Sequence, residues 1–267
     1  MDIEANNKAY IKGRGAQLNP KNRFLKGEYV QEHTEAIDDW EVAERKTEYI
    51  LDHSKTIVNE VKSPDVGMLF SLNPYQGCEH GCIYCYARNS HEYWGYSAGL
   101  DFESKIVVKH KAPQLLRKFL EHKSWKPAPI SLSGNTDCYQ PIERKMKLTR
   151  QLLEICLEFR NPVGIITKNS LILRDTDILE ELAARNLDCV YTSITSVDEE
   201  LRAILEPRTA TYKSRLRVLE TLSKRNIPVG IMNAPLIPGP NDSHIHDTLK
   251  AATEAGAECL FCVQNAA

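Results

Sequence analysis

The sequence predicts an α/β protein built around a partial (β/α)6 barrel of the TIM type, with a mostly irregular N-terminal extension. From residue 68 onward, six short β-like runs alternate with segments whose apolar residues are three and four positions apart. Such repetition is typical of parallel βαβ units with right-handed crossovers, and six units make an incomplete barrel. A content of 42% hydrophobic and 26% charged residues among 267 is that of a globular protein.

Residues 1–64 are expected to form the extension, and residues 65–267 the barrel core. The extension is polar, contains the basic stretch Lys12-Gly-Arg-Gly15, and has no long amphipathic pattern. We expect it to pack over the core with little structure of its own, or alternatively to close one end of the barrel. The chain starts without the features of a signal peptide, and it has no apolar run of membrane-spanning length. These features indicate a cytoplasmic protein, whose thiols stay reduced.

The β-like runs are expected to be the strands of the barrel. They share short length and apolar character, and they are residues 68–72, 130–132, 163–166, 189–194, 229–232 and 259–263. The chain has only a few residues after the sixth run, and no helix follows to cover it. Because an uncovered edge strand favours aggregation, we expect that the sequence is truncated or that another element covers this edge.

Two of the expected helices have clear apolar stripes. The stripes consist of Leu148, Leu152, Cys156 and Phe159, and of Ile178, Leu179, Leu182 and Leu187. Capping boxes are expected where Asp177 precedes Glu180 and where Ser196 precedes Glu199, each by three residues.

Three cysteines lie within one eight-residue window, with the spacing C-x3-C-x2-C: Cys78, Cys82 and Cys85. Thiolates that close together can bind one metal centre. An iron–sulfur cluster is normally held by four cysteines, so three leave one iron open to another ligand. The loop follows the first predicted strand, and chemistry in such barrels lies in the loops after the strands.

A structural zinc site is the main alternative for the cysteine motif. It would need four ligands, and the Cys259–Cys262 segment offers a second pair. Residues three apart in a strand point to opposite faces, however, so both thiols could not easily reach one ion. The remaining cysteines, Cys156, Cys189, Cys259 and Cys262, are expected to be small buried hydrophobic residues.

Polar residues follow the second, third and fourth predicted strands. Residues 133–136 can bring backbone and hydrogen-bonding groups close to a ligand. Lys168 is either a solvated surface charge or a clamp for a carboxylate, and its place on the expected catalytic face favours neither. Ser193 and Ser196 offer hydroxyl groups, although Ser196 is expected mainly to cap a helix.

Two further loops contain charged or conformationally stiff residues. Glu206 and Arg208 form an acid–base pair, which is expected to be a surface ion pair of little energetic value. The loop that begins at Asn233 is rich in proline and glycine. Loops that stiff usually shape a pocket or a turn.

Taken together, these motifs resemble the radical SAM superfamily, and in particular the bacterial group related to spore photoproduct lyase, whose members are often labelled DNA repair photolyases. The resemblance depends on the cysteine loop and on four further motifs. These are residues 136–143 (TDCYQPIE), Thr167-Lys168 with Leu173-Arg-Asp175, Leu205-Glu-Pro-Arg208 and residues 234–239 (APLIPG). With Lys12-Gly-Arg-Gly15 and Asn22-Arg-Phe24, the likeness covers nearly the whole chain, and residues 65–267 are the expected radical SAM core.

The resemblance implies an enzyme in which Cys78, Cys82 and Cys85 bind a four-iron, four-sulfur cluster. S-adenosylmethionine would occupy the open iron and be reductively cleaved to a 5′-deoxyadenosyl radical that abstracts hydrogen from a substrate. The implied cofactor-binding residues are Tyr84, Ser133, Gly134, Asn135, Thr136, Lys168, Ser170, Ser193, Arg208 and Asn233. Among them, residues 133–136 would hold the methionyl amino group, and Lys168 with Ser170 the carboxylate or ribose.

Three residues are implied as catalytic. Tyr84 and Tyr86 flank the last cluster cysteine, where the lyase has the tyrosines of a radical relay. Cys138 is the candidate hydrogen donor, but the corresponding place in the lyase falls near Gly134. Either Cys138 acts from a shifted loop or the reaction differs, and we expect a different reaction.

The resemblance also implies a one-electron donor such as flavodoxin or ferredoxin, and a substrate that is unknown. A nucleic-acid lesion or a modified nucleotide is possible by analogy. A net charge of −2, with a pI of about 6.5, gives no overall basic surface for nucleic acid. The alternative function is a non-catalytic iron–sulfur or zinc module that acts as a sensor or binds nucleic acid. Such a module would have no use for Lys168 or for residues 133–136.

Overall fold

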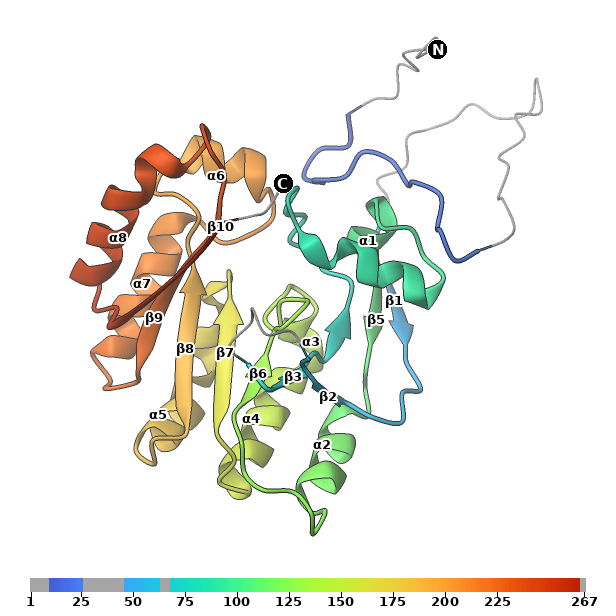
Figure 1. The fold of residues 1–267 in the computed structure, drawn as a ribbon, viewed down its shortest axis with the longest axis vertical. Helices are drawn as coiled ribbons and strands as arrows, with labels where there is room; N and C mark the ends of the chain where they lie inside the picture. Colours follow the sequence, from blue (N-terminus) through green and yellow to red (C-terminus); the bar gives the residue numbers. More distant parts are fainter. Residues whose placement is uncertain (1–9, 26–45, 63–67, 265–267) are drawn as a thin grey trace.

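The computed structural model describes residues 10–25, 46–62 and 68–264, and its main element is a seven-stranded sheet with the order β10-β9-β8-β7-β6-β3-β2 (Figure 1). The strands are β2 (Val58–Glu60), β3 (Phe70–Leu72), β6 (Ile130–Leu132), β7 (Val163–Thr167), β8 (Asp188–Ser193), β9 (Val229–Leu236) and β10 (Cys259–Gln264). Every neighbouring pair from β3 to β10 is parallel, and β2 pairs antiparallel with β3. The six predicted strands and the parallel α/β class are therefore confirmed.

Helices pack against one face of this sheet and bury its apolar side chains. The longer helices are α2 (Ala112–Leu120), α4 (Leu148–Glu158), α5 (Thr176–Ala183), α7 (Tyr212–Ser223) and α8 (Ile245–Glu254). Leu152, Leu179 and Leu219 from three of them join Ile165 and Val190 of the strands in one fully buried cluster. Among the residues that the structure describes, no helix combines the length and apolar character needed to cross a membrane.

The remaining helical segments lie mostly at strand ends and in the first crossover. They are α1 (Leu100–Ser104), α3 (Glu143–Met146), α6 (Glu199–Leu205) and the 3-10 helices η1 (Tyr86–Trp94), η2 (Ser170–Asp175) and η3 (Asp242–His244). The predicted cap of α6 is wrong. Its N-cap is Asp198, whose carboxylate accepts the backbone N–H groups of Glu200 and Leu201. Ser196 instead accepts the N–H of Asp198 at 2.9 Å, two residues before the cap.

The other predicted capping box is also wrong, because the helix begins two residues earlier and its N-cap side chain makes no capping hydrogen bond. The N-cap of α5 is Asp175, and Asp177 lies in the first turn of that helix. The carboxylate of Asp177 is occupied by the guanidinium of Arg150, with nitrogen–oxygen distances of 3.0 and 2.8 Å. Because the carboxylate of Asp177 pairs with a residue of the neighbouring helix α4, it does not cap the N-terminus of α5.

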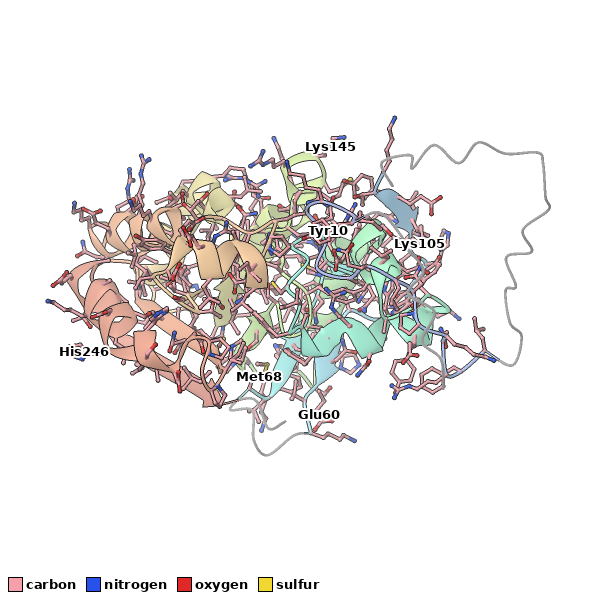
Figure 2. All side chains as sticks on the ribbon, turned by 90° about the horizontal axis from the view of Figure 1, so that it is seen from above. Tyr10, Glu60, Met68, Lys105, Lys145 and His246 are labelled. Carbon is pink, nitrogen blue, oxygen red and sulfur yellow. The ribbon has the colours of Figure 1, made fainter. Side chains whose placement is uncertain are left out.

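A second, three-stranded sheet, which was not predicted, combines two strands of the crossover between β3 and β6 with one strand that precedes β2. It contains β1 (Glu48–Leu51), β5 (Lys105–Val108) and β4 (Tyr75–Gln76), with β5 in the middle. Strands of two to four residues in polar surroundings give no periodic signal. Lys105 of this sheet and His246 of α8 lie at opposite ends of the molecule (Figure 2).

The face of the main sheet opposite the helices, which we call the inner face, has two central rows of uncharged and mostly small side chains. The strand register aligns two rows across it: Ser71, Ser131, Gly164 and Cys189, and then Ile166, Tyr191, Gly230 and Cys259. Cys189 is half-buried and Cys259 is exposed, so the prediction of buried cysteines is wrong for these two and right for Cys156. The side chain of Cys262 lies outside the described part. The inner face is thus open to solvent where a closed barrel would be filled.

Candidate active site

The cysteine loop leaves β4 and returns three thiols to one small region. Cys78 and Cys82 are buried and Cys85 is half-buried. Cys78 and Cys85 pack in one cluster with Ala87 and Phe102, and the N–H of Cys78 donates to the carbonyl of Phe102 at 2.8 Å. The loop thus forms a compact thiol-rich surface at the end of the sheet.

Burial is the main cause that raises the pKa of each of these three thiols. Neighbouring thiols add to it, since Cys82 raises the pKa of Cys78 and Cys85 raises that of Cys82. Lys168 and Arg215 act in the opposite direction on Cys82. Burial therefore favours the protonated thiols, whereas Lys168 and Arg215 favour the thiolate of Cys82, which is the form that binds a metal.

A buried carboxylate fastens this loop to the N-terminal segment. Glu103 is fully buried, accepts the guanidinium of Arg88 at 2.6 Å, and accepts the N–H groups of Gly15 and Ala16 at 3.1 and 2.8 Å. Arg88 in turn donates to the carbonyl of Cys82 at 2.9 Å. The segment that contains the basic KGRG motif is thus bound to the cysteine loop through one acid.

Gly15 makes the closest backbone approach in this contact. A Cβ at this position would lie 1.9 Å from the carbonyl oxygen of Gly81, whereas a Cβ at Gly13 would have nothing within 4 Å. We expect Gly15→Ala to lower the free energy of unfolding by about 2–3 kcal/mol, because backbone must move to admit the methyl group. Gly13→Ala is the control and should cost about 1 kcal/mol, since its φ is positive. Urea titrations that give equal losses for the two variants would contradict the docked arrangement.

Asp137 joins the cysteine loop to the ends of β6 and β7. Its carboxylate accepts Thr167 Oγ1 at 2.8 Å and the N–H of Lys168 at 2.7 Å, and it lies 3.4 Å from His80 Nδ1. Burial opposes ionisation of Asp137, but His80 and the hydrogen bonds outweigh it and lower the pKa. As a carboxylate, Asp137 therefore fixes its own loop after β6 to the cysteine loop and to the loop after β7.

Glu206 is the centre of a second buried network. It is fully buried, pairs with the buried guanidinium of Arg215, accepts Thr195 Oγ1 at 2.9 Å and the hydroxyl of Tyr84, and lies 3.4 Å from Lys168 Nζ. Burial disfavours its charge, yet Arg215 and then Lys168 hold its pKa below the usual range.

The expected surface ion pair between Glu206 and Arg208 is therefore wrong. Arg208 instead approaches Glu79, with a nitrogen–oxygen distance of 4.0 Å, and its N–H donates to the carbonyl of His80. Glu206 faces the interior because the loop turns back toward α7, which supplies Arg215. The acid is thus part of the site, and Arg208 lies at its edge.

The network around Glu206 has one carboxylate and two cations. Arg215 is only 1% exposed and neutralises Glu206, whereas Lys168 is 17% exposed. The ammonium of Lys168 also lies 5.7 Å from the ring centroid of Tyr84. One positive charge therefore remains at the accessible side of the network, next to the cysteine loop, where it can bind an anionic group of a ligand.

The loop after β6 is held in an unusual backbone conformation. Ser133 has a φ of 74°, which is rare for a non-glycine residue and is typical of functional sites. Its hydroxyl accepts the N–H of Cys138 at 2.8 Å. Asn73 accepts the N–H groups of Asn135 and Thr136 at 2.9 and 3.2 Å. The loop is therefore preorganised next to β3 and β4.

The structure places two of the remaining predicted residues near this loop. The hydroxyl of the exposed Tyr86 donates to the carbonyl of Gly134, so this tyrosine links the cysteine loop to the loop after β6. Cys138, in contrast, is fully buried in the main hydrophobic cluster under the helices. The thiol therefore lies in the interior and not at an accessible surface.

Ser193 is the last residue of β8, Asn233 lies within the neighbouring β9, and Ser170 follows the end of β7 by three residues. The carbonyl of Ser193 accepts Arg215 at 2.9 Å, and the amide of Asn233 donates to the carbonyl of Ile194 at 2.7 Å. The Asn233 Oδ1 atom is buried and has no hydrogen-bond partner among the described residues. Ser170 begins η2 and is half-buried.

Sequence reasoning did not select four residues that organise the site: His80, Glu103, Asp137 and Glu206. Asp137 and Glu206 lie within motifs that were noticed, but nothing in those motifs shows that the carboxylates are buried. The partner of Glu103 is 88 residues away at Gly15, a separation that local patterns cannot reveal.

The three thiols of the cysteine loop are a donor set that fits an iron–sulfur cluster. No three His, Cys, Asp or Glu side chains in the described ranges are arranged to hold one metal ion. A cluster binds each thiolate to a different iron, so its ligands need not converge on one point. Three thiols of one loop, with Lys168 and Arg215 beside Cys82, have the chemistry that such a group requires.

Comparisons with known proteins identify a family and relatives of this chain. A family model described as the radical SAM superfamily matches residues 72–252. An uncharacterized protein of Mycobacterium tuberculosis is 32% identical over 208 residues, which are 76% of this chain and 61% of that protein. A protein of Methanocaldococcus jannaschii is 32% identical over 193 residues, covering 72% and 69% of the two chains. The chain spans about three fifths of the length of the first of these relatives.

Solved structures show the same fold at low sequence identity. Spore photoproduct lyase complexed with dinucleoside spore photoproduct superposes with a TM-score of 0.60 and 15% identity, over 86% of this chain and 66% of the lyase. SuiB of Streptococcus suis bound to S-adenosylmethionine gives 0.51 and 14%, over 73% and 38%. With the family match over residues 72–252, the chain belongs to the radical SAM superfamily.

Proposed function

We propose that the chain forms the core of a radical SAM enzyme. Cys78, Cys82 and Cys85 bind a four-iron, four-sulfur cluster, with S-adenosylmethionine at the fourth iron. When bound, these cofactors supply a 5′-deoxyadenosyl radical that abstracts hydrogen from the substrate. The protein binds and orients the cofactors and excludes water from them.

The observation that carries the proposal is the accessible positive charge at Lys168 beside the cysteine loop. Arg215 already neutralises Glu206, so Lys168 is available for the carboxylate of S-adenosylmethionine. A module that only held a metal could favour its thiolates with the buried Arg215 alone, and would not need a second, accessible cation beside it. This favours the enzyme over the non-catalytic sensor or nucleic-acid-binding module.

The other assignments follow from the same arrangement. The loop of residues 133–136 binds the amino group, Tyr84 lies at the adenine, and Ser170, Ser193, Arg208 and Asn233 complete the cofactor site. Tyr84 and Tyr86 are candidates for a radical relay, which is supported by their contacts with Glu206 and Gly134. Burial of Cys138 supports a reaction that differs from one using this thiol as the hydrogen donor.

We also propose a one-electron protein donor, such as flavodoxin or ferredoxin, because reductive cleavage requires one electron. The substrate belongs to an unknown class. A nucleic-acid lesion or modified nucleotide is supported only by the likeness to spore photoproduct lyase, whose solved complex contains a dinucleoside photoproduct. The fold alone does not specify the reaction.

The test is anaerobic reconstitution with iron and sulfide, followed by reduction and assay of 5′-deoxyadenosine released from S-adenosylmethionine. We expect the wild type to release it, and Lys168→Ala to keep its iron while losing most release. The matched control is Lys224→Ala, an exposed lysine at the C-terminal end of α7. Full iron content without 5′-deoxyadenosine in the wild type would reject the enzyme and favour the binding module.

A further inference from the structure

Two thiols and a phenol come together on the inner face of the sheet, away from the cysteine loop. Cys189 is the second residue of β8, Tyr191 lies two positions further along that strand, and Cys259 is the first residue of β10. Gly230 of β9 is in register with both Tyr191 and Cys259. Because these strands are parallel and Lys168 follows the end of β7, the two thiols lie toward the opposite edge of the sheet from the candidate active site.

Gly230 allows the three side chains to meet across β9. A Cβ at Gly230 would lie 2.8 Å from the ring of Tyr191, so the ring covers the backbone of the intervening strand. The phenol interacts with the thiols of Cys189 and Cys259, and the two thiols interact with each other. Two sulfur donors and one oxygen donor are thus mutual neighbours, although β8 and β10 are not paired with each other.

Both thiols can be reached from solvent. Cys189 and Tyr191 are half-buried and Cys259 is exposed, and no side chain in the two aligned rows of the inner face carries a charge. Burial raises the pKa of the Cys189 thiol, and its hydrogen bond with Tyr191 opposes that effect. The phenol therefore favours the thiolate, which is the form that binds metals.

The separation of the two strands excludes a disulfide but suits a bridging ion. Neighbouring strands are about 4.8 Å apart, so the Cα atoms of Cys189 and Cys259 are separated by roughly 9–10 Å or more. A disulfide needs Cα atoms within about 7 Å. An ion replaces the S–S bond of about 2.0 Å by two metal–sulfur bonds of about 2.3 Å each. The thiols can therefore share an ion across a distance that one S–S bond does not span.

The donor set selects a soft ion that needs few ligands. A structural zinc site takes four protein ligands, and the described residues contain no three His, Cys, Asp or Glu side chains placed to hold one ion. Cu(I) is soft and binds thiolates, and two of them satisfy it. Two thiolates with one Cu(I) leave a single negative charge, to which the hydroxyl of Tyr191 can donate a hydrogen bond.

We propose that Cys189 and Cys259 bind one Cu(I) ion as thiolates, with the Tyr191 hydroxyl beside them. Binding releases the two thiol protons to solvent and changes no oxidation state. The ion links β8 to β10 across β9 and stabilises this edge of the described sheet. The inference is independent of the proposed function, because it uses no residue of the cysteine loop.

The first test measures Cu(I) affinity in the chain with its three loop cysteines replaced by alanine, since those thiols also bind Cu(I). Anaerobic competition with bicinchoninate should give one tightly bound Cu(I) per chain. We expect Cys189→Ser and Cys259→Ser, each added to this chain, to weaken binding at least about 100-fold, and Tyr191→Phe about 10-fold, as loss of a ligand's hydrogen-bonding partner does.

Cys156→Ala is the matched control, because it removes a buried thiol of α4 from the other face of the sheet. Its affinity for Cu(I) should equal that of the parent chain, and far-ultraviolet circular dichroism establishes that every variant is folded. Cu(I) should also raise the Tm of the parent chain but not that of its Cys259→Ser variant. Equal affinities in the parent chain and the two serine variants would overturn the inference.

The second test uses the wild-type apoprotein and identifies each cysteine by peptide mapping. Iodoacetamide should alkylate Cys189 and Cys259 but not Cys156, and Cu(I) in excess over the loop thiols should protect both. In Cys259→Ser, Cu(I) should no longer protect Cys189, because a shared ion needs both thiolates. Protection of Cys189 that persists without Cys259, or alkylation of both thiols despite Cu(I), would contradict a shared site.

The two tests also keep this inference separate from the proposed function. Loss of Cu(I) binding in the serine variants would support the copper site whether or not the loop cysteines bind an iron–sulfur cluster. Absence of tight Cu(I) binding in the folded parent chain would overturn the copper site and leave the assignment of the cysteine loop unchanged.

Discussion

The variant Cys82→Ala is expected to lose the iron–sulfur cluster and, with it, release of 5′-deoxyadenosine. Cys82 is the middle ligand of the loop, and its thiol interacts with the charges of Glu206 and Lys168. Changes to groups that merely orient a metal ligand often cost 10–100-fold, so loss of a ligand should reduce release by at least about 100-fold. Iron content, visible absorbance and product release measure the effect in one preparation.

Cys156→Ala is the matched control for this variant. It also removes a buried thiol, but from the helical side of the sheet, and its iron content should equal that of the wild type. Far-ultraviolet circular dichroism establishes that both variants are folded. If Cys82→Ala kept its full iron content, the assignment of the three-cysteine loop as the cluster site would be wrong.

The largest expected effect on stability belongs to Glu206→Gln. The substitution keeps the shape of the side chain but leaves the buried guanidinium of Arg215 without a counter-charge. Breaking a buried ion pair by removing one partner costs about 3–5 kcal/mol. We therefore expect the free energy of unfolding, measured by urea titration, to fall by about that amount.

Glu158→Gln provides the comparison. Glu158 also pairs with an arginine, Arg117, but both side chains are exposed, and such pairs contribute little. The free energy of unfolding of Glu158→Gln should be close to that of the wild type. If the urea midpoint of Glu206→Gln equalled that of the wild type, the stability of the fold would not depend on the ion pair between Arg215 and Glu206.

The cost of Glu206→Gln should also depend on pH. The pKa of Glu206 is lowered in the folded protein from its ordinary value of 4.5. Its contribution to stability is therefore fully present above about pH 4.5 and is lost progressively as the pH falls below that value. The difference between wild type and variant should shrink in acid, and a difference independent of pH would contradict a charge-based origin.

Local patterns in the sequence determined the order and the parallel arrangement of the main strands. Apolar runs such as residues 163–166 need only their own composition and spacing to be recognised, because short runs rich in valine and isoleucine are typical of strands. The three-cysteine spacing is local in the same way, so the family and its expected metal ligands could be inferred from the sequence alone.

The tertiary structure alone decided how the acids and thiols of the site are used. Whether Glu206 is a surface charge or a buried counter-ion depends on where α7 places Arg215, and whether Gly15 matters depends on Glu103, 88 residues away. Cys189 and Cys259 likewise have the sequence pattern of core residues, and only the strand register places them beside Tyr191 on an open face. Burial and partners are properties of contacts between distant segments, and a short motif contains no information about those contacts.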